Sequence, residues 1–175
     1  MSKSVSSPAA LPIANAALRI LIIVNWVFGA AILVLLVFIP NREWIMNSLE
    51  LSPSAEAERV IMGLRAVAVI GIAMVPLHYA ILKRMFAIVE TVRAGDPFVA
   101  ANAERLQSIA WVLLVLQLVS FVVGAINKFI STPGHPIDLD AGFSLNGWLA
   151  VLLTFVLARV FAEGARMRDE LEGTV

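Results

Sequence analysis

The chain has 175 residues, of which 60% are hydrophobic and none is cysteine, and its 13 Lys and Arg balance its 13 Asp and Glu. The lack of cysteine excludes disulfides, thiol catalysis and iron–sulfur ligation, and the zero formal net charge gives no global reason to bind nucleic acid. A mean hydropathy of +0.89 is typical of an integral membrane protein.

Four apolar segments, separated by short polar stretches, dominate the chain. The first is about twenty residues long with Asn25 as its only strongly polar residue, which at about 1.5 Å per helical residue crosses about 30 Å of hydrocarbon. It is too long for the apolar region of a signal peptide, so we expect a retained helix. The prediction is an all-α fold, an integral membrane four-helix bundle. We expect a flexible N-terminal segment, 1–15, and one domain, 16–175, with spans at about 16–39, 60–82, 108–127 and 144–162.

The second helix is predicted to begin before its apolar part. Ser52 suits the N-cap, Pro53 suits the first helical position, and Glu56 and Glu58 suit the positively polarised first turn. The preceding segment, 43–49, has a mixed pattern that predicts a short helix at the membrane surface.

Helical patterns continue past the apolar segments. After the second segment, apolar residues recur on one helical face up to Val92, and Gly95 suits the left-handed C′ position that ends a helix. Asp96 and Pro97 suit the N-cap and first position of the next helix. The fourth segment also continues as an amphipathic helix, through Leu171. We therefore expect at least three helices to extend beyond the membrane on one side.

Lys and Arg are distributed unequally between the two sides of the predicted bundle. Nine of the 13 lie near the N-terminus, between the second and third segments, or in the C-terminal region. The positive-inside rule then places both termini and the middle connection in the cytoplasm. The nine are Lys3, Arg19, Lys83, Arg84, Arg93, Arg105, Arg159, Arg166 and Arg168.

Polar residues inside the spans are candidate functional residues because they are costly in hydrocarbon. Asn25 and His78 lie in the first two segments, and Gln117, Ser120 and Gly124 form a stripe on the third. One interpretation is packing or oligomerisation, since small residues allow close approach and amides hydrogen-bond between helices. The other is a ligand or ion path, in which His78 could change charge near neutral pH.

Motifs for catalysis and metal binding are absent from the sequence. It has no Gly-rich phosphate loop, no nucleophile elbow, no His-Glu-x-x-His motif and no paired carboxylates inside a span. His135, Asp138 and Asp140 share one loop, but one His with two acids is a weak metal signal. We expect no catalytic residues, no cofactor and no metal site, in a protein that is not an enzyme.

Two polar segments carry a more specific pattern. Residues 93–106 contain Gly-x-Pro-Phe-x-x-x-Asn-x-x-Arg-Leu, which resembles the G-x-P-F-x-x-x-N-x-x-R/K-L segment of the DUF2975 family of bacterial membrane proteins. Residues 160–175 are similar to that family's ending, F-x-x-G-x-x-L-x-x-E-x-x-x-T-V/I, with Met167 at the usual Leu. Four spans at matching positions extend the resemblance over nearly the whole chain.

The resemblance implies a small four-span protein of the bacterial inner membrane, and members of that family are often encoded beside a short helix-turn-helix regulator. It therefore implies a regulatory protein that binds such a cytoplasmic partner through its helical surface, without contacting nucleic acid itself. Asn102, Glu104 and the acidic tail, 169–172, are expected to face the partner, although the motif could simply join two helices. The full set of partner-binding candidates is Asp96, Phe98, Asn102, Glu104, Arg105, Gly164, Asp169 and Glu170.

Two further functions stay open at the level of sequence. A small oligomeric transporter or channel would use Asn25, His78 or Gln117, since four short helices enclose little space alone. A structural subunit would pack on a larger membrane complex. In each case the bilayer surrounds the spans and a homo-oligomer is possible.

Overall fold

The computed structural model describes residues 10–38, 55–131 and 141–172, and four long helices account for nearly all of them. They are α1 (Ala10–Phe38), α3 (Ala55–Arg93), α4 (Ala100–Ile130) and α5 (Leu145–Glu172). The described ranges contain no strand, so the predicted all-α fold is confirmed. The helix predicted over 43–49 and the cap predicted at Ser52 lie outside the described residues.

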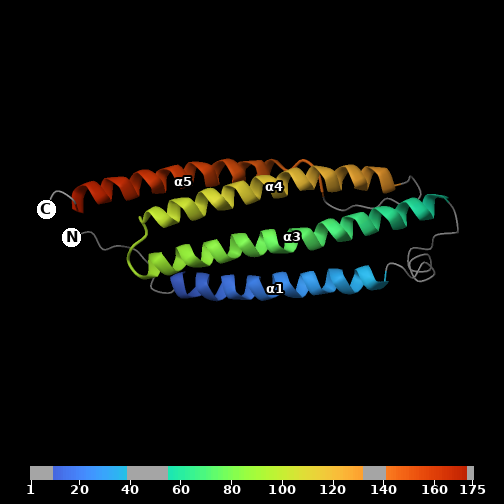
Figure 1. The fold of residues 1–175 in the computed structure, drawn as a ribbon, viewed down its shortest axis with the longest axis horizontal. Coiled ribbons are helices and arrows are strands. Elements are labelled where there is room, and N and C mark those ends of the chain that lie inside the picture. Colours follow the sequence, from blue (N-terminus) through green and yellow to red (C-terminus); the bar gives the residue numbers. More distant parts are fainter. Residues whose placement is uncertain (1–9, 39–54, 132–140, 173–175) are drawn as a thin grey trace.

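The helices lie side by side in chain order and alternate in direction (Figure 1). α3 packs on α1, α4 packs on α3, and α5 packs on α4, which gives an open form of the predicted bundle. One end of this row holds the start of α1, the turn between α3 and α4 over residues 94–99, and the end of α5 (Figure 1). We call it the polar end, because the charged end of α5, Glu104 and Arg105 of α4, and Lys83, Arg84, Glu90 and Arg93 of α3 lie there.

All four helices are long and apolar enough to cross a membrane, so the chain is a multi-pass membrane protein. The 39 residues of α3 correspond to about 58 Å at about 1.5 Å per residue, which is nearly twice the ~30 Å of a hydrocarbon core. α4 has 31 residues and α5 has 28, so they are also longer than the roughly 20 residues that a span needs. The predicted extension of these helices beyond their apolar parts is confirmed.

α1 presents most of its surface outward. Only 6% of its most apolar stretch is buried within the protein, and most of its large apolar side chains are exposed on the faces that do not pack on α3. Such exposure suits a helix surrounded by lipid, because lipid tails are as apolar as the side chains themselves. α1 also begins earlier than expected, since residues 10–15 are helical rather than part of a flexible segment. Pro12 is tolerated there because the N–H groups of a first turn have no helical partner.

Small residues set the closest approaches between the helices. A Cβ atom on Gly63 of α3 would overlap the fully buried side chain of Ile130 on α4. A Cβ on Gly124 would lie 2.9 Å from the Cα of Gly142. The backbone of α4 therefore contacts the backbone of the segment that precedes α5. Ser120, one turn from Gly124, donates a hydrogen bond to the Gly142 carbonyl and accepts one from its N–H, both at 3.1 Å. This stripe of α4 positions the start of α5.

Candidate functional site

The polar end is built around a tight turn that stops α3. Gly95 has a φ of 85°, in the left-handed region that glycine adopts without steric cost. Its N–H donates to the Val92 carbonyl at 3.1 Å, and the Asp96 N–H donates to the Thr91 carbonyl at 3.0 Å. These two bonds form a Schellman motif, which satisfies carbonyl groups at the end of a helix. The predicted C′ role of Gly95 is therefore confirmed.

The next helix starts later than the sequence predicts. α4 begins at Ala100, and residues 96–99 have no helical structure, so Asp96 is not the N-cap and Pro97 is not the first helical residue. Val99 occupies the N-cap position with extended backbone and no side-chain cap. The Asp96 carboxylate is instead paired with Arg168 of α5, and this tertiary contact replaces the local cap.

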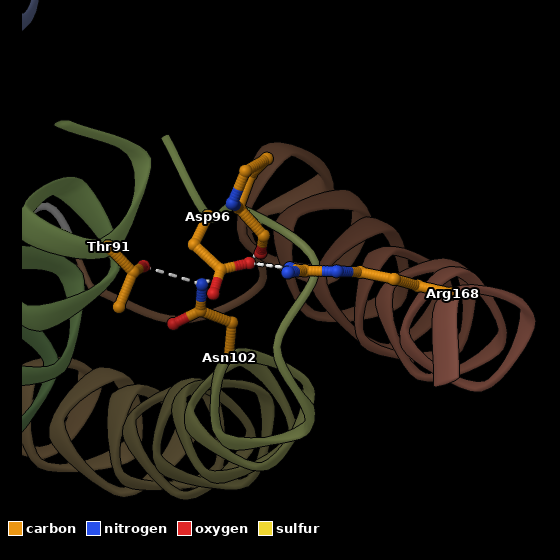
Figure 2. A network of polar contacts seen from close by, with 5 residues as sticks. Thr91, Asp96, Asn102 and Arg168 are labelled. Atoms are coloured by element: carbon orange, nitrogen blue, oxygen red, sulfur yellow. Dashed lines mark hydrogen bonds and ion pairs between the residues drawn. The ribbon is translucent and has the colours of Figure 1, made fainter. Parts of the chain in front are cut away.

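Asn102 is the centre of a hydrogen-bond network that holds the turn. Its side chain is 0% exposed. Its Nδ2 donates to the Thr91 hydroxyl at 2.6 Å (Figure 2). The same Nδ2 donates to the Pro97 carbonyl at 2.9 Å, so the end of α3 and the turn are both tied to α4. Its Oδ1 accepts a hydrogen bond from Arg105 at 2.7 Å. The expectation that Asn102 faces a partner is therefore contradicted, because every side-chain interaction is internal and the residue is buried.

The end of α5 is joined to the turn by an ion pair and by aromatic packing. Arg168 donates to the Asp96 carboxylate, which lies 72 positions earlier in the chain (Figure 2). The ring of Phe98 lies 5.3 Å from that of Phe161 and rests on Gly164, where a Cβ would come within 2.8 Å of Phe98. Gly164 is thus needed for packing inside the protein, and Phe98 remains partly exposed.

α1 is tied to the same end by residues that the sequence pattern did not single out. Asn15, which is buried, donates its side-chain N–H to the Glu90 carboxylate of α3. Glu90 also accepts from Arg93 at 3.0 Å. One turn after Asn15, the Arg19 guanidinium lies 5.6 Å from the centroid of the Phe86 ring. All four helices therefore meet in polar contacts at this end.

The remaining partner-binding candidates lie on the surface. Glu104, Asp169 and Glu170 are exposed on α4 and α5. Glu170 lies 3.6 Å from Arg166, which also donates to Glu163 at 2.5 Å. Of the eight candidates, the structure thus places Asp96, Asn102, Arg105 and Gly164 in internal contacts. The three carboxylates and part of the Phe98 ring are exposed at the surface.

The polar residues inside the spans form hydrogen bonds between elements. Asn25 of α1 donates to the Val75 carbonyl of α3 at 3.2 Å, and Gln117 of α4 donates to the Ser144 carbonyl at 3.4 Å. Gln117 is buried against Gly147 of α5. The Gln117 amide occupies the space that a Cβ on residue 147 would need. The packing interpretation of Asn25 and Gln117 is supported by these contacts, since each amide joins two segments.

His78 lies on the exposed side of α3, two residues after Pro76. α3 continues through Pro76 without interruption. The Nδ1 of His78 lies 2.9 Å from the Met74 carbonyl oxygen of its own helix. Among the described residues, no group of three or more His, Cys, Asp or Glu could hold a metal ion. The loop with His135, Asp138 and Asp140 lies outside the described ranges.

These observations define the class of the protein. It is a multi-pass membrane protein whose four long helices are joined at one end by two buried asparagines, a glycine turn and a long-range ion pair. The chain belongs to the DUF2975 family, described as a protein of unknown function, which matches residues 43–175. The matched residues include α3, α4, α5 and both motif segments, whereas α1 precedes them. Comparison with curated proteins and with solved structures gives no match.

Proposed function

We propose that this protein is a non-enzymatic regulatory protein of the bacterial inner membrane that captures a soluble partner at its polar end. The observation that carries the proposal is the display of Glu104, Asp169 and Glu170 on the exposed surface of α4 and α5. The backbone beneath them is fixed by the Asn102 network and by the pair between Asp96 and Arg168. A preorganised surface loses less conformational freedom when it binds.

The chemistry of this surface favours a partner with a basic face. Helix-turn-helix domains carry such a face, because their affinity for DNA depends on Lys and Arg that contact phosphates. When such a regulator docks on the exposed carboxylates, its Lys and Arg are no longer free to contact DNA phosphates, so the regulator is kept off DNA. The proposed partner is therefore a small helix-turn-helix regulator, in agreement with what the family resemblance implies, and the membrane protein itself needs no contact with nucleic acid.

This function requires the polar end to lie in the cytoplasm. The positive-inside rule favours that orientation, because Lys83, Arg84, Arg93 and Arg105 all lie towards this end. The chain has no cysteine, so the single variant Ala94→Cys on the exposed turn reports its side directly. We expect a membrane-impermeant maleimide to label it in inverted vesicles but not in intact spheroplasts. Labelling in intact spheroplasts would place the turn outside and remove the basis of the proposal.

Capture of the partner can be tested with a matched pair of variants. The triple variant Glu104→Gln, Asp169→Asn, Glu170→Gln removes the three exposed carboxylates, and Glu58→Gln makes one such change on α3 at the opposite end. After crosslinking in native membranes, we expect a DNA-binding protein to co-purify with the wild type and with Glu58→Gln, and at least tenfold less of it with the triple variant. Addition of the purified membrane protein in nanodiscs should then release that regulator from its DNA. Failure to recover any DNA-binding protein, or equal recovery with the triple variant, contradicts the proposal.

The transporter alternative keeps one specific observation in its favour. Asn25 and His78 both line a groove of about 430 Å³ between α1 and α3, within the apolar part of the helices. In reconstituted liposomes, solute flux that is lost in Asn25→Ala or His78→Ala would support it over partner capture. A structural subunit is distinguished differently, by co-purification of a membrane protein in equal amounts.

A further inference from the structure

A groove runs between α4 and α5 at the polar end. Its volume is about 480 Å³. Its floor is made of small side chains, because alanines face one another across the two helices at Ala103, Ala158, Ala162 and Ala165. Two aromatic contacts lie beside it: Trp111 of α4 meets Phe155 of α5, and Phe98 of the turn meets Phe161 of α5. On α5, the groove runs from Phe155 past these alanines to Arg166 and Asp169.

The groove spans the expected membrane surface. Phe155 lines its inner end and makes an edge-on contact of 5.3 Å with Trp111, and tryptophan is enriched at membrane–water interfaces. On α3, the apolar run ends at Lys83 and Arg84, about as far from the α3–α4 turn as Trp111 is. Beyond Phe155, the groove therefore continues from the hydrocarbon border through the depth at which lipid headgroups lie.

Two opposite charges line the groove at this depth. Glu104 of α4 and Arg159 of α5 both lie between the Phe98–Gly164 and Trp111–Phe155 contacts, so they are at similar heights on facing helices. No hydrogen bond or ion pair joins either side chain to another described residue. Arg166, further along the groove, is already paired with Glu163 at 2.5 Å. At the expected depth of the headgroups, the groove therefore presents one carboxylate and one guanidinium, and neither has a protein partner among the described residues.

We propose that this groove binds a zwitterionic aminophospholipid, phosphatidylethanolamine. Arg159 donates to the phosphate, Glu104 accepts from the ammonium, and an acyl chain lies over Phe155 and the neighbouring alanines. The charges of the site match both charges of this headgroup, and charge-assisted hydrogen bonds are stronger than neutral ones. An anionic lipid would meet the repulsion of Glu104, and the quaternary ammonium of a choline lipid has no N–H to donate.

The test compares three lipids on purified protein. Protein delipidated in a mild detergent is titrated with phosphatidylethanolamine, phosphatidylcholine or phosphatidylglycerol, and binding is followed by native mass spectrometry and by the thermal midpoint. We expect phosphatidylethanolamine to bind most tightly, with Arg159→Gln and Glu104→Gln each weakening it about tenfold, the loss of one charge-assisted hydrogen bond. Arg65→Gln, the same change on α3 far from the groove, should leave binding unchanged. The midpoints of all variants without lipid establish that they fold.

Several results would overturn the inference. Equal or tighter binding of phosphatidylglycerol, or binding that neither variant alters, excludes the proposed headgroup site. A doubled mass in detergent that both variants abolish would assign the groove to a second copy of the chain instead. The inference does not rest on partner capture: Arg159→Gln is expected to lose the lipid while retaining the soluble partner, so the two proposals fail separately.

Discussion

Replacing Asn102 by alanine is expected to loosen the whole polar end. The side chain is fully buried and forms three hydrogen bonds, two donated to Thr91 and Pro97 and one accepted from Arg105. The substitution removes all three at once. It also leaves the Pro97 carbonyl and the Thr91 hydroxyl without their donor, while the backbone N–H of residue 102 can still donate to Val99.

The magnitude follows from the number and kind of these bonds. A typical intramolecular hydrogen bond contributes about 0.5–1.5 kcal/mol net, so three of them give a loss of about 2–4 kcal/mol in the free energy of unfolding. This would be a large part of the roughly 5–15 kcal/mol that holds an ordinary domain folded. The exposed Asn146 of α5 offers a matched control, and Asn146→Ala is expected to change stability by less than about 0.5 kcal/mol.

Unfolding of the purified protein in mixed micelles, with increasing SDS and circular dichroism as the readout, measures both variants. Trypsin cleavage at Arg93 and Arg105 locates the change, because cleavage should accelerate in Asn102→Ala if the turn opens first. In a Thr91→Val background, the loss of unfolding free energy caused by Asn102→Ala should be about 1 kcal/mol smaller. The hydrogen bond between the two side chains is already absent in that background. A loss no greater than that of Asn146→Ala, or an unchanged effect in the Thr91→Val background, would show that this network does not hold the turn.

Three further experiments test the turn, the helix packing and the ion pair. Gly95→Ala should cost about 1–2 kcal/mol for its left-handed backbone alone, because a Cβ there meets no atom within 4 Å; a neutral result in the same micelle assay would contradict the φ of 85°. Gly63→Ala should cost about 1–3 kcal/mol by overlap with Ile130, and the double variant with Ile130→Ala should lose less than the sum of the single losses. A double-mutant cycle of Asp96→Asn and Arg168→Gln should give a coupling of only about 0.2–1 kcal/mol, because the two side chains are 40% and 42% exposed; additive effects would mean that the pair is not formed in solution.

The turn between α3 and α4 shows which features a local sequence pattern predicts and which it does not. Gly95 was predicted as the C′ residue because a left-handed backbone at a helix end depends on the residue itself. Asp96 and Pro97 were predicted to cap α4 by the same local logic, and that prediction was wrong. The Asp96 carboxylate is paired with an arginine 72 positions away, and α4 begins at Ala100, three residues after its predicted start. A capping preference of about 1 kcal/mol is small enough to be overridden by tertiary contacts.

The buried asparagines show what a one-dimensional pattern leaves out. A polar residue on an amphipathic helix is expected to face water or a partner, and Asn102 was interpreted in this way. In the structure its burial is possible because three partners satisfy its amide, and those partners come from α3, the turn and α4 itself. Asn15 is buried in the same manner by Glu90, 75 positions later in the chain. No spacing rule along a helix predicts a partner at such a separation.

The sequence by itself determined the class, the four spans and the extension of α3, α4 and α5 beyond the apolar segments, because hydropathy and helical periodicity depend only on neighbouring residues. The tertiary structure decided which polar residues are internal and which carboxylates remain on the surface. It also decided that Arg159 and Glu104 line one groove, in which Arg166 is already paired with Glu163. These outcomes depend on distances between helices, which are set by where glycines and alanines let backbones approach.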